Sequence, residues 1–399
     1  MRTNSNRKVH QLKRDPYKTL LRTVGILAAL VVVGVGVFYL CSVAVTRDFV
    51  AKRQQIDEQN AQNEVEFNAR MNELRNNANA FMNPITGEVT AQDLPFWEKT
   101  LGGAVWRVED EGKAELENTS TVTMNRSDLL LGGLLLINPW HSVPLDYAYD
   151  TLVSIGSTSG YKIQVTDNTV KLFPAAYEAL AALIEAGSAE GMDNYIVREA
   201  YRSNESQTTM FENKMTELSD KYSGDILIAE AKKEVNYPGT SEYQTGFSFR
   251  MDLYSKDDVE FNKNKGKFQE SERGQWFTEN AWIYGIVFRV PVDNFPSSAL
   301  ESKTYNTGIS SKLNLYRFVG KAHSAVMRAM DYCLEEYVEF LIQHPHITVY
   351  QDGALKYEIY RVTAGDTETS FTLPVPNPAS SFQASMDNMG GIVLAYSYN

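Results

Sequence analysis

The chain has 399 residues and a formal net charge of −12, with 43% hydrophobic and 22% charged residues. This is an ordinary globular composition, over a length that allows one to three domains with a real core. The acidic balance argues against nucleic acid as a partner, because phosphate binding needs a basic face.

Charge and cysteine are both distributed unevenly. Residues 1–22 contain seven Lys or Arg and one Asp, so they carry +6 and leave −18 for the rest of the chain. Of the two cysteines, Cys41 lies in an apolar run, which leaves Cys333 alone in the remaining sequence. This arrangement excludes an intrachain disulfide there, and it excludes a cysteine-based metal site.

An apolar stretch over residues 20–45 predicts a transmembrane helix. The segment from Val24 to Leu40 carries no charge, and with its flanks it exceeds the roughly 20 residues that a bilayer crossing needs. Because basic residues precede it, we expect a cytoplasmic tail over 1–19 and an extracytoplasmic location for the bulk of a single-pass protein of the cell membrane. A cleaved signal peptide is the alternative.

The next segment, 46–82, is polar and almost free of Gly and Pro, which predicts a helical stalk. Its apolar residues recur on one helical face, at Phe67, Met71, Leu74, Ala78 and Phe81. The stripe favours packing against the chain's own globular part, and a coiled-coil homo-oligomer is the alternative. Asn83-Pro84 ends the helix, and 83–128 is expected to form a small lead-in subdomain of unassigned role.

From residue 129 onward the chain carries an ordered series of motifs. They are an apolar strand and turn over 134–147, a helix over 174–185 that begins with Pro174, a strand at 195–197, Glu199-Ala200-Tyr201-Arg202-Ser203 with Gln207 downstream, Ser241-Glu242-Tyr243-Gln244-Thr245-Gly246, the aromatic-rich 274–291, Arg317-Phe318-Val319-Gly320 with His323, and Leu334-Glu335-Glu336-Tyr337.

In this order the motifs of 129–345 resemble those of VanY-type D-alanyl-D-alanine carboxypeptidases, which are zinc DD-peptidases. The family's patterns are "LLLVN…PLP.DY", "SGYRS", "SEHQTG", "GxWLxxNAxxYGFxxRYP", "RYVG…HA" and "LEEYL". Each pattern alone is weakly specific, whereas the ordered set is specific. The resemblance implies an α+β fold with the DD-peptidase (hedgehog-like) core of helices and antiparallel strands.

The resemblance also implies a chemistry, because such an enzyme binds one Zn²⁺ through two His and one Asp and leaves the fourth position for water. A Glu takes the proton of that water, and the metal polarises the scissile carbonyl. The residues on either side fix the register of these positions in this chain. The first His position is Tyr243, the Asp position is Arg250, the base position is Lys312 and the second His position is Leu315.

None of these four residues can do the work of the one it replaces. Arg250 stays protonated, Leu315 has no donor atom, and Tyr243 would have to ionise from a pKa near 10. Lys312 is a cation at neutral pH unless it is strongly desolvated. We therefore expect no zinc cofactor and no intact catalytic residue. A misaligned motif is one alternative, and a different metal site built from Asp252, Asp257, Asp258 or Glu260 is another, although a charge run of this kind is usually a solvated loop.

The altered site predicts a cleft for anions. Arg202, Arg250 and Lys312 would converge there, with Ser241 and Gln207 as further members of a peptide-binding or anion-binding set. Fixed cations bind carboxylates by charge-assisted hydrogen bonds without cutting anything. Alternatively, Arg250 and Lys312 pair with Glu242 or Asp252 and close the site.

After Pro345 the pattern changes to alternation, which predicts a C-terminal β extension over 346–399. Asp352-Gly353 between apolar-alternating flanks is a strong hairpin signal, and 370–375 and 392–398 predict two further strands. The extension would either cover the core or present an edge to a partner.

Three function classes remain open at this point. One is a pseudoenzyme that binds or scaffolds at the cell wall, with a peptidoglycan stem peptide or a membrane or cell-wall protein as its partner. A second is an active D,D-carboxypeptidase that trims stem peptides. The third is a structural subunit of a membrane complex. The first is favoured, because the positions for metal and base are substituted.

Overall fold

The computed structural model describes residues 17, 24, 26–27, 30–40, 43 and 96–398, without 113–114, 161, 297–299, 310–313, 366 and 378. The chain divides into two units, Met1–Ala78 and Asn79–Asn399, and the described residues of the first unit are helical. The predicted stalk (46–82) and the start of the lead-in segment (83–95) lie outside the described residues.

The predicted membrane location is contradicted. Among the residues that the structure describes, no helix combines the length and the apolar character that a bilayer crossing requires. This finding overturns the prediction of a single-pass protein with residues 20–45 in the lipid bilayer.

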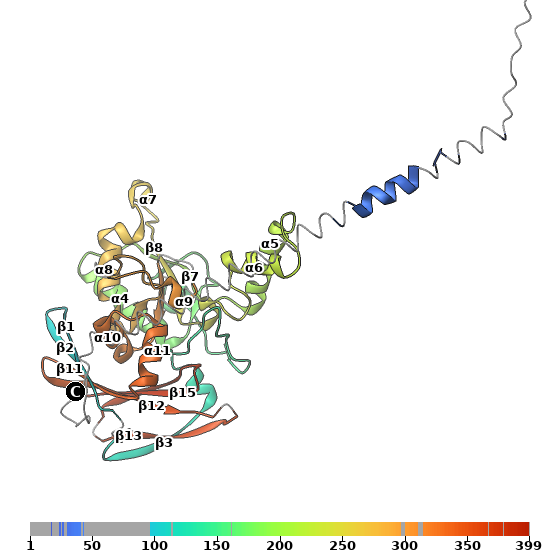
Figure 1. The fold of residues 1–399 in the computed structure, drawn as a ribbon. Coiled ribbons are helices and arrows are strands. Elements are labelled where there is room, and N and C mark those ends of the chain that lie inside the picture. The colour runs from blue at the N-terminus through green and yellow to red at the C-terminus, as the bar shows by residue number, and fades with distance from the viewer. Residues whose placement is uncertain are drawn as a thin grey trace, which may run out of the picture. The chain divides into compact units, whose positions relative to one another are not determined.

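Two sheets organise the second unit (Figure 1). The five-stranded sheet has the order β5-β7-β8-β10-β9, in which only β5 and β7 run parallel. Its strands are β5 (Gln164–Val165), β7 (Tyr195–Glu199), β8 (Ser248–Leu253), β9 (Ile286–Phe288) and β10 (Leu315–Phe318). The six-stranded sheet has the order β1-β2-β11-β12-β15-β14 and is antiparallel throughout. Its strands are β1 (Phe96–Leu101), β2 (Ala104–Asp110), β11 (His346–Gln351), β12 (Ala354–Thr363), β14 (Ser381–Met386) and β15 (Gly391–Ser397).

Two small ribbons and the helices complete the unit. The ribbons are β3 (Thr119–Asn125) with β13 (Ser370–Pro376) and β4 (Val153–Ser154) with β6 (Lys171–Leu172). The α-helices are α2 (Arg126–Leu130), α3 (Ile155–Thr158), α4 (Pro174–Ala189), α5 (Asn204–Leu218), α6 (Gly224–Glu234), α7 (Val259–Asn264), α8 (Glu272–Asn280), α9 (Thr304–Thr307), α10 (Lys321–Met330) and α11 (Leu334–Gln343). Three short 3₁₀ turns are η1 (Glu242–Thr245), η2 (Phe268–Glu270) and η3 (Ala281–Tyr284).

Alternation along β8 decides which face of the five-stranded sheet is available for a site. Phe249, Met251 and Leu253 are buried in the same cluster as residues of α4 and α8, such as Leu180 and Phe277. Successive side chains of a strand point to opposite faces, so Arg250 lies on the face away from these helices. That face therefore carries Arg250, which the sequence predicts to stand at the Asp position of the zinc site.

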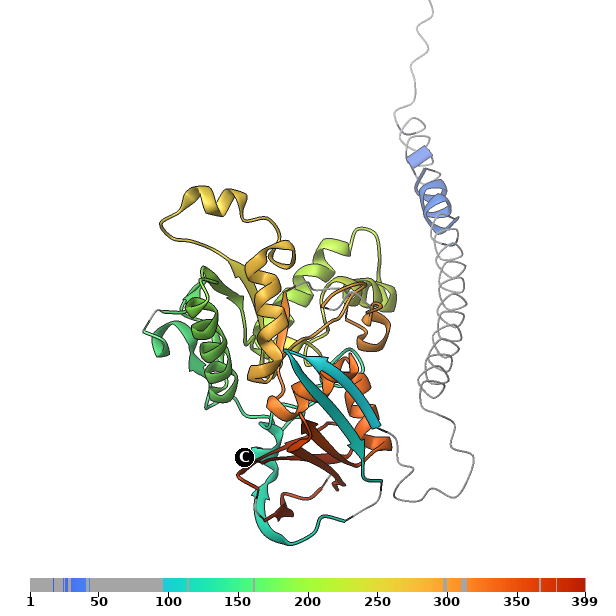
Figure 2. The ribbon, with the colours of Figure 1, turned by 90° about the vertical axis from the view of Figure 1, so that its left-hand side faces the viewer.

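The six-stranded sheet joins segments from both ends of the second unit. Its core-facing side chains, among them Val108, Ile359 and Val393, pack with Val326 of α10 and Leu341 of α11 in one cluster. The other face of β15 packs on the β3–β13 ribbon. Figure 2 shows the β1–β2 hairpin beside the C-terminal strands. The lead-in and C-terminal segments, which were expected to form separate parts, thus contribute strands to the same sheets. The domain boundaries themselves stay predictions.

Several local predictions are confirmed. The helix that begins at Pro174 runs to Ala189, and β7 begins at Tyr195 as expected. Asp352 and Gly353 form the two-residue turn between β11 and β12, and both have positive φ, as a type I′ turn requires.

Candidate functional site

Three of the four residues predicted to replace the zinc site, Tyr243, Arg250 and Leu315, lie within the described residues, and the structure brings them together. Leu315 of β10 is paired directly with Arg250 of β8, and Arg250 in turn is paired with Glu199 of β7. Cross-strand partners project to the same face, so these three side chains form a row across the sheet. Tyr243 lies in η1, the turn that leads into β8. Lys312 lies outside the described residues.

An apolar cluster fills the centre of this arrangement. Tyr243 and Leu315 pack with Val290 and Ile309, and the four side chains are at most 3% exposed. Burial raises the pKa of the Tyr243 hydroxyl well above its usual range, and the Glu199 carboxylate adds to the shift. The phenolate that could bind a metal is therefore disfavoured, and the cluster offers hydrocarbon where zinc needs nitrogen or oxygen donors.

Zinc does not fit these residues. In the part of the chain that the structure describes, no group of three or more His, Cys, Asp or Glu side chains could hold a metal ion. The alternative acidic site over 252–260 is not assembled: Asp252 pairs with Arg198 at 3.2 Å and Lys265 at 2.8 Å. Asp258 caps α7 instead, by accepting from the backbone N–H of Phe261 at 2.8 Å.

The two other histidines that the motifs include are held elsewhere. The ring Nδ1 of His141 lies 2.8 Å from Asn138 Oδ1. His323 is fully buried, and its Nδ1 lies 2.7 Å from the Tyr337 hydroxyl. Burial lowers the pKa of His323 to about 3, so this imidazole stays neutral.

The predicted binding residues differ sharply in how available they are. Arg202 forms an ion pair with Glu199, donates to Gln207 Oε1 at 2.6 Å, and places its guanidinium carbon 4.7 Å from the centre of the Tyr243 ring. Gln207 is fully buried, and it donates to the Asn236 carbonyl at 2.6 Å. Ser241 is 1% exposed. These three residues therefore stiffen the wall of the site.

Arg250 is the exposed member of the set. The sequence offered Glu242 or Asp252 as an ion-pair partner for Arg250. The structure instead pairs Asp252 with Arg198 and Lys265, and it pairs Glu242 with Arg289 and Arg317. Its backbone is fixed between β7 and β10, so the guanidinium projects from a rigid strand beside the apolar cluster.

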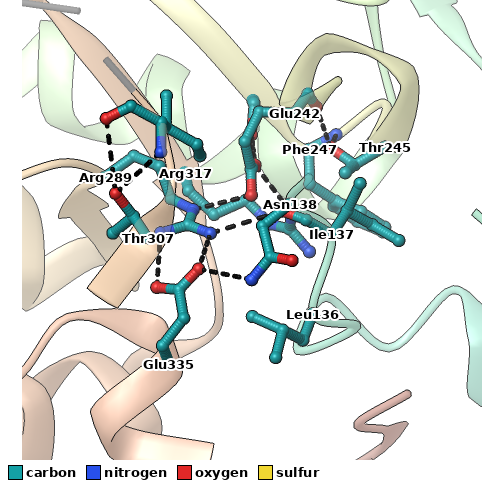
Figure 3. A network of polar contacts seen from close by, with 12 residues as sticks. Leu136, Ile137, Asn138, Glu242, Thr245, Phe247, Arg289, Thr307, Arg317 and Glu335 are labelled. Atoms are coloured by element: carbon teal, nitrogen blue, oxygen red, sulfur yellow. Dashed lines mark hydrogen bonds and ion pairs between the residues drawn. The ribbon is translucent and has the colours of Figure 1, made fainter. Parts of the chain in front are cut away.

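A buried charge network supports the site from behind, and sequence reasoning did not assign it (Figure 3). Glu242 accepts from Arg289 at 2.6 Å, Arg317 at 2.9 Å and Ser248 at 2.5 Å. Burial would raise the pKa of Glu242, but the charges of Arg289 and Arg317 outweigh it and hold the pKa below its usual range. The carboxylate is therefore ionised inside the protein.

The same network extends to α11 and to the segment 133–138, which has an isolated bridge at Asn138 rather than the strand expected from the sequence. Arg289 also donates to both carboxylate oxygens of Glu335, at 2.9 and 2.7 Å, and Glu335 accepts from the amide of Asn138 at 3.0 Å. Arg317 donates to the carbonyls of Gly133 and Leu135, at 2.9 Å each. The motif residues of the sequence thus meet here, and they fix η1, β9, β10 and α11 relative to one another.

Comparison with known proteins finds similarity to one family of carboxypeptidases. The family model described as "VanY: D-alanyl-D-alanine carboxypeptidase" matches residues 169–305, a range that includes Tyr243 and Arg250. A D-alanyl-D-alanine carboxypeptidase of Enterococcus faecium is 26% identical over 290 residues, which are 71% of this chain and 81% of the relative. Over these regions the chain is similar to VanY-type D-alanyl-D-alanine carboxypeptidases.

Two further matches are similar to this chain over about half or more of its length. The "Putative carboxypeptidase YodJ" of Bacillus subtilis is 28% identical over 206 residues, which are 52% of this chain and 67% of the relative. The solved structure of the vancomycin resistance D,D-dipeptidase VanXYg, in complex with a D-Ala-D-Ala phosphinate analogue, has a TM-score of 0.53 and 23% identity. The match covers 70% of this chain and 99% of the VanXYg chain, and it shows that the two share a fold.

Proposed function

We propose that this protein is a VanY-type homologue without zinc-dependent peptidase activity, which acts by binding. The observation that carries the proposal is the packing of Tyr243 and Leu315 against Val290 and Ile309. Two positions that the family's motif gives to histidine ligands are here part of a small hydrophobic cluster. A ligand set that has become hydrophobic packing neither holds a metal nor activates water.

The remaining substitutions support the same conclusion. Arg250 brings a permanent positive charge to the position of a carboxylate ligand, where it would repel Zn²⁺. Lys312 stands at the position of the general base, and an ammonium has no lone pair with which to accept a proton. The peptidase step therefore lacks its metal, its activated water and its base.

The ligand that suits the site best is the C-terminal carboxylate of a peptide. Arg250 is exposed and projects from a rigid strand. An arginine fork binds a carboxylate in a bidentate manner. VanXYg was solved with a D-Ala-D-Ala phosphinate analogue. A peptidoglycan stem peptide that ends in D-Ala-D-Ala is accordingly the ligand to test.

Metal content and turnover test the loss of activity. The purified chain is incubated with excess zinc, desalted, and assayed for bound zinc and for D-Ala release from a D-Ala-D-Ala peptide. We expect no stoichiometric zinc and no release. The positive control is a quadruple reversion, Tyr243→His, Arg250→Asp, Lys312→Glu and Leu315→His, which restores the donor set. One zinc per unmodified chain together with D-Ala release would overturn the proposal.

Calorimetry with the same peptide tests the binding role. We expect a measurable affinity that Arg250→Ala weakens by about tenfold or more, because one charge-assisted bond to the carboxylate is lost. Lys256→Ala is the matched control, since it removes an exposed cation from the loop that follows β8. A peptide amide lacks the carboxylate. Its affinity for the wild type should therefore be no higher than the affinity of the free-acid peptide for Arg250→Ala. No heat with the acid at about 10 mM, where a Kd of about 1 mM would be nearly saturated, refutes peptide binding.

A further inference from the structure

A cavity of about 490 Å³ lies between the six-stranded sheet and the peptidase-like core. One wall is the sheet, where Trp106, Gln351, Tyr357 and Ser397 line the cavity, and the opposite wall is Trp282 of η3 with Lys321 of α10. It shares no residue with the substituted zinc site. Its size is in the range of ordinary small-molecule sites.

The register of the sheet explains why these side chains meet. Gln351 of β11 is paired with Trp106 of β2, and Tyr357 of β12 is paired with Ser397 of β15, which is paired in turn with Ser381 of β14. Directly paired residues project to one face. Other residues on the same face of the sheet pack against the core. The cavity lies at the end of the sheet, where this packing stops.

Aromatic rings form the inner part of the cavity. The rings of Trp106 and Trp282 meet edge to face with centroids 5.4 Å apart, and Tyr357 stacks on Trp106 at 6.4 Å with 16° between the planes. All three side chains are less than a tenth exposed, so their positions are set by packing before any ligand arrives. Such rings offer a rigid apolar surface to the face of a ligand ring.

The outer part of the cavity is polar and positive. Lys321 and Lys356 both line it, and in the part of the chain that the structure describes neither ammonium has a hydrogen-bond or ion-pair partner. Gln351 and three serines, Ser380, Ser381 and Ser397, line it as well. The described lining contains no Asp or Glu, in a chain whose net charge is −12. Two cations without a counter-charge therefore favour an anion at this place.

From this combination we infer that the cavity is a binding site for an acidic carbohydrate, that is, a sugar or sugar alcohol bearing a carboxylate or a phosphate. The rings contact the apolar face of the sugar, the serine hydroxyls and the Gln351 amide bind its hydroxyl groups, and the two lysines bind its acid group. A purely apolar ligand would leave the lysines and hydroxyls desolvated without partners, which costs free energy.

The site depends on both flanks of the family core. β1 and β2 come from the segment before the core, β12, β14 and β15 come from the segment after it, and η3 and α10 belong to the core itself. The inference thus gives the two flanking segments a shared role in building a second ligand site. It does not rest on the peptide-binding role of Arg250.

Ligand titration of the full chain tests the inference, by calorimetry or by saturation-transfer NMR. The probes are N-acetylmuramic acid and glucuronic acid for the carboxylate class, glycerol 1-phosphate for the phosphate class, and N-acetylglucosamine as the neutral sugar. We expect at least one acidic class to bind and the neutral sugar to bind at least tenfold more weakly. Whichever acidic class binds identifies the source of the acid group. Raising the salt concentration should weaken binding, since the two lysines are reached by solvent.

Variants then connect the binding to the cavity. Lys321→Ala and Lys356→Ala should each weaken acidic-sugar binding by about tenfold, the effect of losing one hydrogen bond to a charged group. Lys171→Ala, which removes an exposed lysine outside the cavity, should leave binding unchanged. Ser381→Trp should block the cavity from its exposed edge.

Three results would overturn the inference. The first is that none of the acidic probes binds at about 10 mM, where a Kd of about 1 mM is nearly saturated. The second is that the neutral sugar binds as tightly as the acidic ones. The third is that binding survives in both lysine variants and in Ser381→Trp. Far-UV circular dichroism of each variant confirms that a loss of binding is not a loss of folding.

Discussion

Glu242→Gln is the substitution that tests the buried charge network most directly. Gln keeps the shape of the side chain and removes its charge. In the wild type the Glu242 carboxylate is 3% exposed and accepts from two guanidinium groups, those of Arg289 and Arg317. The variant leaves both cations buried while removing the carboxylate that they share.

The expected loss in the free energy of unfolding is about 3 kcal/mol. Removing one partner of a buried pair costs about 3–5 kcal/mol, because an uncompensated charge remains inside the protein. The loss falls at the lower end of this range because each cation keeps other partners. Arg289 still donates to both oxygens of Glu335, and Arg317 still donates to two backbone carbonyls.

Urea unfolding followed by tryptophan fluorescence measures this loss. With a slope of about 3 kcal/mol/M, a loss of about 3 kcal/mol moves the midpoint down by about 1 M. Two further variants give the ranking. Glu335→Gln should cost less than Glu242→Gln, since Glu335 is 12% exposed and Arg289 keeps Glu242. Glu279→Gln, at an exposed position, should change stability by no more than about 0.5 kcal/mol.

The pH dependence has a definite sign. Glu242 has a lowered pKa in the folded state, so its stabilisation is complete above its ordinary pKa of 4.5 and is lost as the pH falls through the lowered value. The gap in stability between wild type and Glu242→Gln should therefore narrow as the pH falls below 4.5. A gap below about 1 kcal/mol at neutral pH, or one that widens in acid, would refute the reasoning.

Three further predictions concern other parts of the second unit. Leu315→Ala should cost about 2–5 kcal/mol in urea unfolding, because a fully buried leucine leaves a cavity, and a loss below about 1 kcal/mol would mean that the cluster is loosely packed. Gly320→Ala should destabilise more than Gly353→Ala, since both glycines have positive φ but a Cβ at Gly320 would lie 1.9 Å from Gln383 Oε1 whereas nothing lies near Gly353; equal losses would contradict this. The His323 ring should not titrate above about pH 4 by NMR, because burial lowers its pKa to about 3. Below pH 6.5 the unfolded state binds a proton on this ring that the folded state does not bind, so the residue's contribution to stability falls as the pH drops. A titration near pH 6.5 would show that the ring is solvated.

Local pattern was sufficient for much of the fold. The helix at Pro174, the strand at Tyr195 and the turn at Asp352-Gly353 depend on neighbours in the sequence, and all three are confirmed. The sequence register also places Tyr243, Arg250 and Leu315 where the structure brings them together, although their role stays a proposal. Residue type alone predicted that these positions would not hold zinc, and this stays a prediction.

Long-range pairing was beyond the sequence. No local sequence pattern predicts that β2 pairs with β11. Nor does one predict that Glu242 pairs with Arg289 and Arg317 rather than with Arg250, which is nearer in the sequence. Which cation wins a buried carboxylate depends on three-dimensional geometry and on desolvation. The prediction of a membrane helix over 20–45 rested on hydropathy, and among the described residues no helix meets the requirement for a bilayer crossing.

The position of β15 in the six-stranded sheet has a consequence for biosynthesis. The last strand of the chain lies between β12 and β14, and residues near the beginning of the same unit pair with β11. While the chain is being made, the sheet stays open at these edges until residue 397 has left the ribosome. Unpaired edges can pair with wrong strands, so the nascent chain passes through an aggregation-prone stage that lasts until the seven residues of β15 are available. Expression of chains that stop before Gly391 should therefore depend on chaperones far more than expression of the full chain.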